Sequence, residues 1–121
     1  MAFEVSLQTV SVPASADLST KQFLFGTINA SGQVAVVGAG LASDGVIALG
    51  PSAQARPCGL ASFPGQIARV MAGASFANGA LLEADANGKA ITQSSGKILA
   101  KALAAAGAAG DIVPVLLILQ R

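Results

Sequence analysis

Among the six acidic residues of this sequence, which are its most obvious acid–base groups, only Glu83 and Asp85 stand close together. On a strand, residues i and i+2 share a face, so these two could form an acidic pair able to catalyse hydrolysis. The alternative is that both are solvated residues flanking a hairpin turn. We favour the turn, because residues 85–88 end in the Asn-Gly signal of a tight hairpin.

Histidine is absent, which removes the commonest general base and the commonest transition-metal ligand. Cys58 is the single cysteine, so it can build neither a thiolate metal site nor a Cys–His nucleophile pair. We therefore expect Cys58 to be chemically silent. We also expect no catalytic residue, no metal and no cofactor, and the chain is predicted not to be an enzyme.

Three segments superficially resemble ligand-binding loops. Residues 38–43 begin like a dinucleotide-binding fingerprint, but Ser43 takes the sixth position and no βαβ unit follows. Residues 95–97 look like part of a phosphate loop, but Ile91 stands where that motif needs glycine. Residues 85–88 turn too soon for a calcium loop. We therefore expect no small-molecule substrate.

Composition argues against nucleic acid and membrane as partners. The seven basic residues are scattered and there is no Trp or Tyr, whereas nucleic-acid binders concentrate basic residues and often interleave aromatics. The longest strongly apolar run, residues 112–119, is far shorter than the roughly 18 residues that span a bilayer. The first ten residues show no secretory signal, and a single cysteine fits synthesis in a reducing cytosol.

The surface is expected to be poor in charge. Charged residues make up 11% of the chain and hydrophobic residues 53%, while an ordinary soluble domain carries about 25% charged residues. This low charge predicts that part of the surface is buried in an assembly, because a soluble monomer usually carries more surface charge. The alternative is a neutral surface supplied by Ala, Gly and Ser.

Apolar and polar residues alternate at the start of the chain, with Phe3, Val5 and Leu7 on one face. This alternation is typical of a strand, and it resumes after a slip and ends at Pro13. It could be a strand of the main sheet or an extended arm laid on a neighbouring subunit. We assign residues 1–20 to this strand or arm, with Phe3, Val5 and Leu7 as candidate contacts.

The rest of the chain predicts short strands separated by turn signals roughly every 8–12 residues, the spacing of a sandwich or barrel. We expect residues 52–64 to be an exposed loop, while residues 97–106 suit a helix by composition and a strand by alternation. No internal repeat is evident. The predicted fold is therefore all-β, a small single-domain barrel or sandwich. The expected strands are residues 22–28, 33–37, 46–49, 66–72, 80–84, 89–92 and 112–119.

Several segments occur in an order that resembles the capsid cement, or head-decoration, family of tailed bacteriophages, formerly a domain of unknown function. They are residues 45–47, the strand around Val70, residues 80–90, 98–103 and 110–117, with further similarity at residues 13–21 and 29–34. The resemblance implies a β-rich fold, a strand at residues 98–103 and no catalytic residues. It also implies binding to the outside of a head built from the major capsid protein, with residues 21–121 forming the decoration domain.

The expected function is therefore a non-enzymatic structural protein on the outer capsid surface of the virion, made in the cytoplasm of the bacterial host. We expect it to bridge major capsid protein subunits and to stabilise the shell against the pressure of packed DNA. A homotrimer is favoured and a dimer is the alternative, with Phe3, Val5 and Leu7 contacting the capsid or another copy. The second hypothesis is a ligand- or carbohydrate-binding β-domain, although sugar sites usually stack rings on Trp or Tyr.

Overall fold

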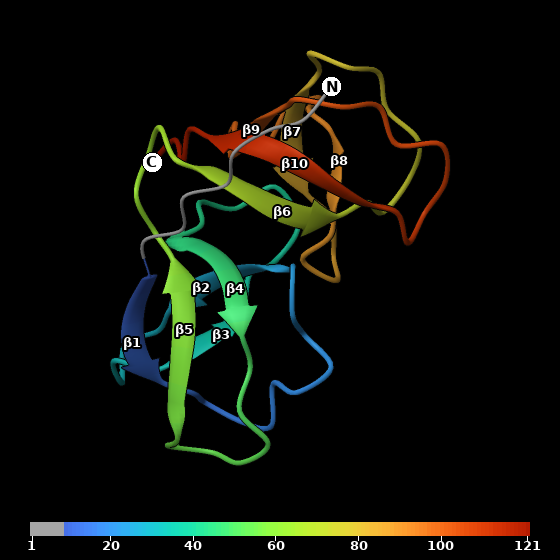
Figure 1. Ribbon diagram of the computed structural model, residues 1–121. Helices are drawn as coiled ribbons and strands as arrows, with labels where there is room; N and C mark the ends of the chain where they lie inside the picture. The colour runs from blue at the N-terminus through green and yellow to red at the C-terminus, as the bar shows by residue number, and fades with distance from the viewer. Residues whose placement is uncertain (1–8) are drawn as a thin grey trace.

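The computed structural model describes residues 9–121, and within them the chain forms ten strands and no helix (Figure 1). The strands build two five-stranded antiparallel sheets, with the orders β1-β5-β4-β2-β3 and β6-β10-β9-β7-β8. This confirms the all-β prediction. The strands are β1 (Thr9–Pro13), β2 (Phe25–Ile28), β3 (Val34–Val36), β4 (Gly45–Leu49), β5 (Pro57–Ala61), β6 (Ile67–Met71), β7 (Leu81–Ala84), β8 (Ala90–Thr92), β9 (Ala100–Ala102) and β10 (Ile112–Leu117).

The first sheet curls around a small core of its own. Its two edge strands approach each other where Ala14, just after β1, forms a parallel bridge with Val34 at the start of β3. Val12 and Val10 pack on this core from β1. The buried side chains inside the curl are Ala14, Leu18, Val34, Ile47, Cys58 and Leu60.

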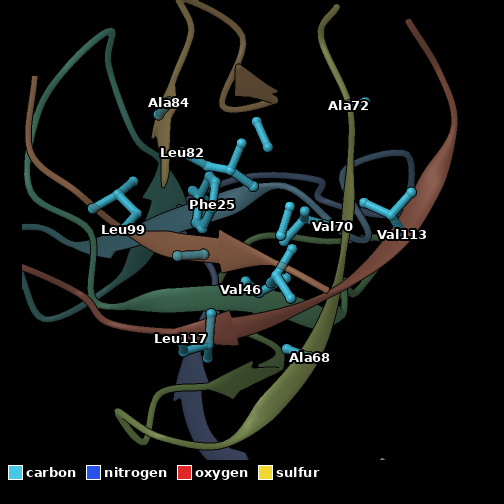
Figure 2. Packing of buried hydrophobic residues seen from close by; sticks show 14 of the residues in the cluster. Phe25, Val46, Ala68, Val70, Ala72, Leu82, Ala84, Leu99, Val113 and Leu117 are labelled. Atoms are coloured by element: carbon cyan, nitrogen blue, oxygen red, sulfur yellow. The ribbon is translucent and has the colours of Figure 1, made fainter. Parts of the chain in front are cut away.

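The second sheet shares a larger core with one face of the first. Phe25, Val46 and Ala61 of the first sheet belong to the same buried cluster as Val70, Leu82 and other residues of the second. Figure 2 shows this cluster, with Phe25 among side chains from the second sheet. Because one hydrophobic cluster spans both sheets, they pack as the two layers of a β-sandwich in a single domain.

The two sheets have the same topology. Adding five to each strand number of the first order, β1-β5-β4-β2-β3, produces the second order. Both sheets also close in the same way, since the parallel bridge of Ala14 to Val34 is matched by a bridge of Ala72 to Ala90. We therefore call residues 9–61 the first module and residues 67–117 the second module.

The two β-hairpin turns show how closely the modules agree. In the first, the Asn29 side chain accepts hydrogen bonds from the N–H groups two and four residues later, both at 3.0 Å. In the second, Asp85 accepts the same two bonds at 2.8 and 2.9 Å. Gly32 and Gly88 take positive φ angles of 75° and 77° at the ends of these turns. The expectation of no internal repeat is therefore wrong at the level of structure.

The structure overturns one sequence-based assignment and decides another that was left open. The expected loop at residues 52–64 contains β5, which is the second strand of its sheet and carries the buried side chains of Cys58 and Leu60. Pro57 obscured this strand, but it is the strand's first residue, a position where proline is tolerated. Residues 97–106 contain the strand β9 rather than a helix, as the family resemblance implied.

Gly45 shows why glycine is needed where β4 meets β5. Its φ angle is +150°, and a Cβ atom built there would lie 2.2 Å from the carbonyl oxygen of Ala61. No other residue fits without moving the backbone of β5, so this glycine permits the close approach of the two strands.

Asp44 ties the loop before β4 to β2 and to Arg121 near the C-terminus. Its carboxylate accepts hydrogen bonds from the Ile28 N–H at 2.7 Å and the Thr27 hydroxyl at 3.1 Å, and it pairs with the Arg121 guanidinium. Partial burial acts to raise the pKa of Asp44, but the Ile28, Arg121 and Thr27 donors together hold this pKa below its ordinary value.

Replacing Asp44 with asparagine is expected to weaken the acid sensitivity of the fold. Because the folded-state pKa of Asp44 is lowered, its stabilisation is present above the unfolded pKa of about 3.9 and is lost as pH falls through the folded value. Arg121 is largely exposed, so we expect a loss of only about 1 kcal/mol near pH 7. Urea unfolding of both proteins from pH 7 to pH 2 measures this, and equal pH slopes below pH 4 would contradict it.

Candidate interaction surfaces

The structure gives Glu83 and Asp85 separate structural roles. Asp85 flanks the β7–β8 turn and accepts hydrogen bonds there, as the turn hypothesis predicted. Glu83 is only 6% exposed, and its Oε1 accepts hydrogen bonds from the Ser94 N–H at 3.1 Å and the Ser94 hydroxyl at 3.0 Å. The expectation that Glu83 is solvated is therefore wrong. Both line an open hollow of about 470 Å³, together with Gly40 and Gly96.

The fixed contacts of Glu83 identify it as a structural acceptor. A Cβ atom on Gly96 would lie 1.9 Å from its Oε2 and 2.5 Å from the Cα of Gly40, so three segments meet tightly here. Gly40 also bridges the modules, since its N–H donates to Ala84 and its carbonyl accepts from Lys97. The carboxylate therefore lies at the junction of the two modules, and its hydrogen bonds stay within the second module.

The remaining candidates for chemistry are also placed by the fold. Cys58 lies in β5 and is fully buried, and this burial raises the pKa of its thiol. Within residues 9–121, no three His, Cys, Asp or Glu side chains gather closely enough to hold a metal ion. The same part of the chain contains no helix with the length and hydrophobicity to cross a membrane.

The candidate contacts Phe3, Val5 and Leu7 lie outside the described residues. The later part of the same alternating segment is β1, which pairs with β5 from Thr9 to Pro13. This pairing makes residues 9–13 an integral strand of the first sheet.

A row of three side chains on the first module faces the second module. Phe25, Val46 and Ala61 are direct neighbours across β2, β4 and β5, and neighbouring pairs in a sheet point to the same face. All three are at most 2% exposed, because the second module covers them. We call these residues the inner row.

The same row exists on the second module but is largely uncovered. Leu81, Lys101 and Leu116 are direct neighbours across β7, β9 and β10, the strands that correspond to β2, β4 and β5. Leu81 is 40% exposed, Lys101 is exposed and Leu116 is half-buried. We call these residues the outer row.

The part of the second module that contacts Phe23, Phe25 and Gly40 of the first module also has an uncovered counterpart. Gly88 accepts a hydrogen bond from the Phe25 N–H at 2.8 Å, and Met71 donates one to the Phe23 carbonyl at 2.9 Å. These two residues and the buried Ala84 form what we call the inner patch. The corresponding residues of the first module are Pro13, Ile28 and Gly32, all exposed, which we call the outer patch.

Comparison with known proteins identifies the family of the chain. The family model described as "Phage cement protein" matches residues 9–117 of the chain. The chain belongs to the phage cement protein family. This match spans both modules, and it makes the chain a structural protein of the phage head.

A solved structure extends the comparison of this cement-family chain. The N base of the head fiber gp8.5 of bacteriophage phi29 is similar over 94% of this chain and 98% of that chain, with a TM-score of 0.72. The two sequences are 16% identical, so the similarity concerns the fold. The search of curated proteins found no match.

The two rows and the two patches of this cement-family chain were not predicted from the sequence. The available signal was the pair of Asx-Xaa-Xaa-Gly turns, at residues 29–32 and 85–88, that mark the same hairpin in each module. Exposure could not be predicted, because the same position is buried in one module and open in the other. Phe25 and Leu81 differ in this way at equivalent positions.

Proposed function

We propose that this protein binds the outer surface of a phage head as a homo-oligomer, a trimer rather than a dimer, and bridges major capsid protein subunits. In this role it stabilises the shell against the pressure of the packed DNA. The observation that carries the proposal is the cement-family match over residues 9–117. The similarity in fold to a head-fiber base over 94% of the chain supports it.

The physical basis of the proposal is multivalent contact. A protein that touches two or three capsid subunits at once gains effective affinity without any single strong contact. Trimers suit local threefold axes of a head, because cyclic symmetry of the oligomer then matches that of the site. Pulling the capsid subunits apart would break these contacts, so the bound protein resists expansion of the shell.

The surface of the described residues has the side chains that such contacts need. Seven large apolar side chains are between 37% and 67% exposed: three in the first module, two in the second, one between the modules and one after the second. Surface apolar side chains contribute to a protein interface when a partner covers them. They are Ile28, Leu41, Leu49, Phe63, Leu81, Ile112 and Ile118.

Binding to heads is the direct test of the proposed function. Purified protein is mixed with undecorated heads, and the heads are sedimented and imaged. We expect saturable binding, with extra density at repeated positions on the outer surface that contact more than one major capsid protein subunit. Absence of binding at saturating protein, together with binding to a glycan array, would support the ligand-binding alternative.

Replacing Phe3, Val5 and Leu7 together with serine is expected to weaken head binding. If each side chain gains about 1 kcal/mol from partial burial on a neighbour, the affinity falls roughly 100-fold. Co-sedimentation with heads at a series of protein concentrations measures the change. The matched control replaces Glu4 and Gln8, on the other face of the alternation, with serine. Equal affinity of the triple variant and the control would exclude Phe3, Val5 and Leu7 as contacts.

A further inference from the structure

We propose that the outer row of one chain docks on the outer patch of a second copy, so that the contact between modules within the chain is repeated between chains. This inference rests on the self-association that is part of the proposed function. It identifies the partner as the chain itself, and the two surfaces as Leu81, Lys101 and Leu116 on one copy and Pro13, Ile28 and Gly32 on the next.

The contact inside the chain is the template for the contact between chains. In it, the side chain of Phe25 enters the shared core while its N–H donates to the Gly88 carbonyl at 2.8 Å. A Cβ atom on Gly88 would lie 2.5 Å from Val36 and 3.1 Å from the Phe25 carbonyl, so the turn of the second module fits closely against the first. Backbone and side chains both take part, so the geometry is specific.

This template is asymmetric, and it leaves one copy of each surface open. The first module offers its row to the second module, while the residues of the first module's own patch, Pro13, Ile28 and Gly32, are exposed. Gly32 has no heavy atom within 4 Å of a built Cβ, whereas the equivalent Gly88 is crowded. Ile28 is 40% exposed where the equivalent Ala84 is 1% exposed. Within residues 9–121, each chain therefore leaves one row and one patch open.

The chemistry of the open surfaces fits a reversible version of the same contact. Leu81 and Ile28 are both 40% exposed. Docking of the row of one copy on the patch of the next would bury both side chains and remove their apolar area from water. Lys101 replaces Val46 in the row, and its methylene stem can pack on the partner while the ammonium stays in water. Pro13 replaces Met71 and has no N–H, so one hydrogen bond of the template is lost. The contact between chains is therefore weaker than the contact within.

A row-to-patch contact is head-to-tail, so it joins unlike surfaces of identical chains. Contacts of this type close into rings when the rotation allows and otherwise continue as filaments. Three chains joined in this way would place six modules in one ring, with contacts within and between chains in alternation. This is the trimer of the proposed function with its interface assigned to particular residues.

The test uses the full chain and four variants, with oligomer mass measured by native mass spectrometry and by light scattering over a range of concentrations. Leu81→Asp removes the row, Ile28→Asp removes the patch, and the double variant removes both. Leu49→Asp is the matched control, because Leu49 is 67% exposed and belongs to neither surface. Thermal unfolding of the variants checks that each one folds.

We expect the wild-type chain and Leu49→Asp to form oligomers, and each single variant to be monomeric at the same concentration. An equimolar mixture of Leu81→Asp and Ile28→Asp should form a dimer with one chain of each, because one intact row meets one intact patch. The double variant alone should be monomeric, because it lacks both the row and the patch. Recovery of a mixed dimer that stops at two chains is the signature of a head-to-tail contact.

Two results would overturn the inference. One is a wild-type chain that is monomeric both free and on heads, and the other is a mixture of the single variants that stays monomeric while the wild type is oligomeric. A monomer that still decorates heads would overturn this assignment and leave the capsid-binding function in place. Oligomers that form by this contact but bind no heads would support this assignment and overturn the capsid-binding function.

Discussion

Replacing Phe25 with alanine should lower the free energy of unfolding by about 3–5 kcal/mol, the usual cost of deleting a large aromatic side chain from a core. Phe25 is fully buried, and it belongs to the cluster that joins the two sheets. The cavity left behind would open between the modules, where the backbone is tied to Gly88 and cannot easily collapse. Chemical denaturation of dilute protein measures the change.

The matched control is Leu81→Ala, because Leu81 holds the equivalent position in the second module and is 40% exposed. It should cost about 1 kcal/mol or less in dilute protein. Phe25→Leu is a milder variant that keeps most of the buried volume, and it should still fold if the alanine variant does not. Equal losses at Phe25 and Leu81 would contradict the asymmetric packing of the two modules.

Phe25 is buried between the modules while the equivalent Leu81 is exposed, and this burial affects how the modules act together. Burial of the inner row joins the two modules through one hydrophobic cluster. Under the proposed function, we expect force applied to one module to pass to the other, because close-packed interiors transmit strain. In the proposed function, contacts made by surfaces on different modules would then hold two neighbouring subunits at a set distance. A chain whose modules moved independently would bind both neighbours without resisting their separation.

Turn chemistry and alternation made much of the fold predictable from the sequence. The turn at residues 85–88 was predicted because Asn-Gly adopts positive φ with little strain, and the structure places Gly88 at 77°. The strands around residues 22–28, 66–72 and 112–119 followed from short apolar runs between turn signals, and the structure has β2, β6 and β10 there.

The strand β5 was missed for a physical reason. Pro57 and Gly59 interrupt the pattern of Cys58 and Leu60, so local propensity favoured a loop. Pairing with β1 on one side and β4 on the other overrides that preference. Tertiary hydrogen bonding of this kind does not leave a signal in a window of five residues.

The repeated topology was missed because the modules share backbone geometry rather than side chains. The bridge of Ala14 to Val34 corresponds to that of Ala72 to Ala90. The first bridge contains a valine where the second has an alanine. The interaction surfaces could not be predicted either, since they depend on which module covers the other. The N-terminal contacts Phe3, Val5 and Leu7 remain a prediction from alternation alone.

Heads that carry the protein should release their DNA at a higher temperature than heads that lack it. Contacts that form only on the intact shell stabilise that state by mass action, by about 2.7 kcal/mol per site when free protein is at 100 times its dissociation constant. A shell has many such sites, so a small stabilisation at each one adds up. Assembly of the shell should be less affected, because the protein acts on the finished surface.

The most direct test of the cement function is the thermal DNA-release curve of decorated and undecorated heads, measured in one buffer with a fluorescent DNA dye. The proposed function predicts that undecorated heads release DNA at a lower temperature, and that adding purified protein restores resistance in proportion to occupancy. An unrelated protein that does not bind heads, added at the same concentration, serves as the reference for nonspecific effects of added protein. Superimposable curves at full occupancy would contradict the account, because the protein would then coat the shell without reinforcing it.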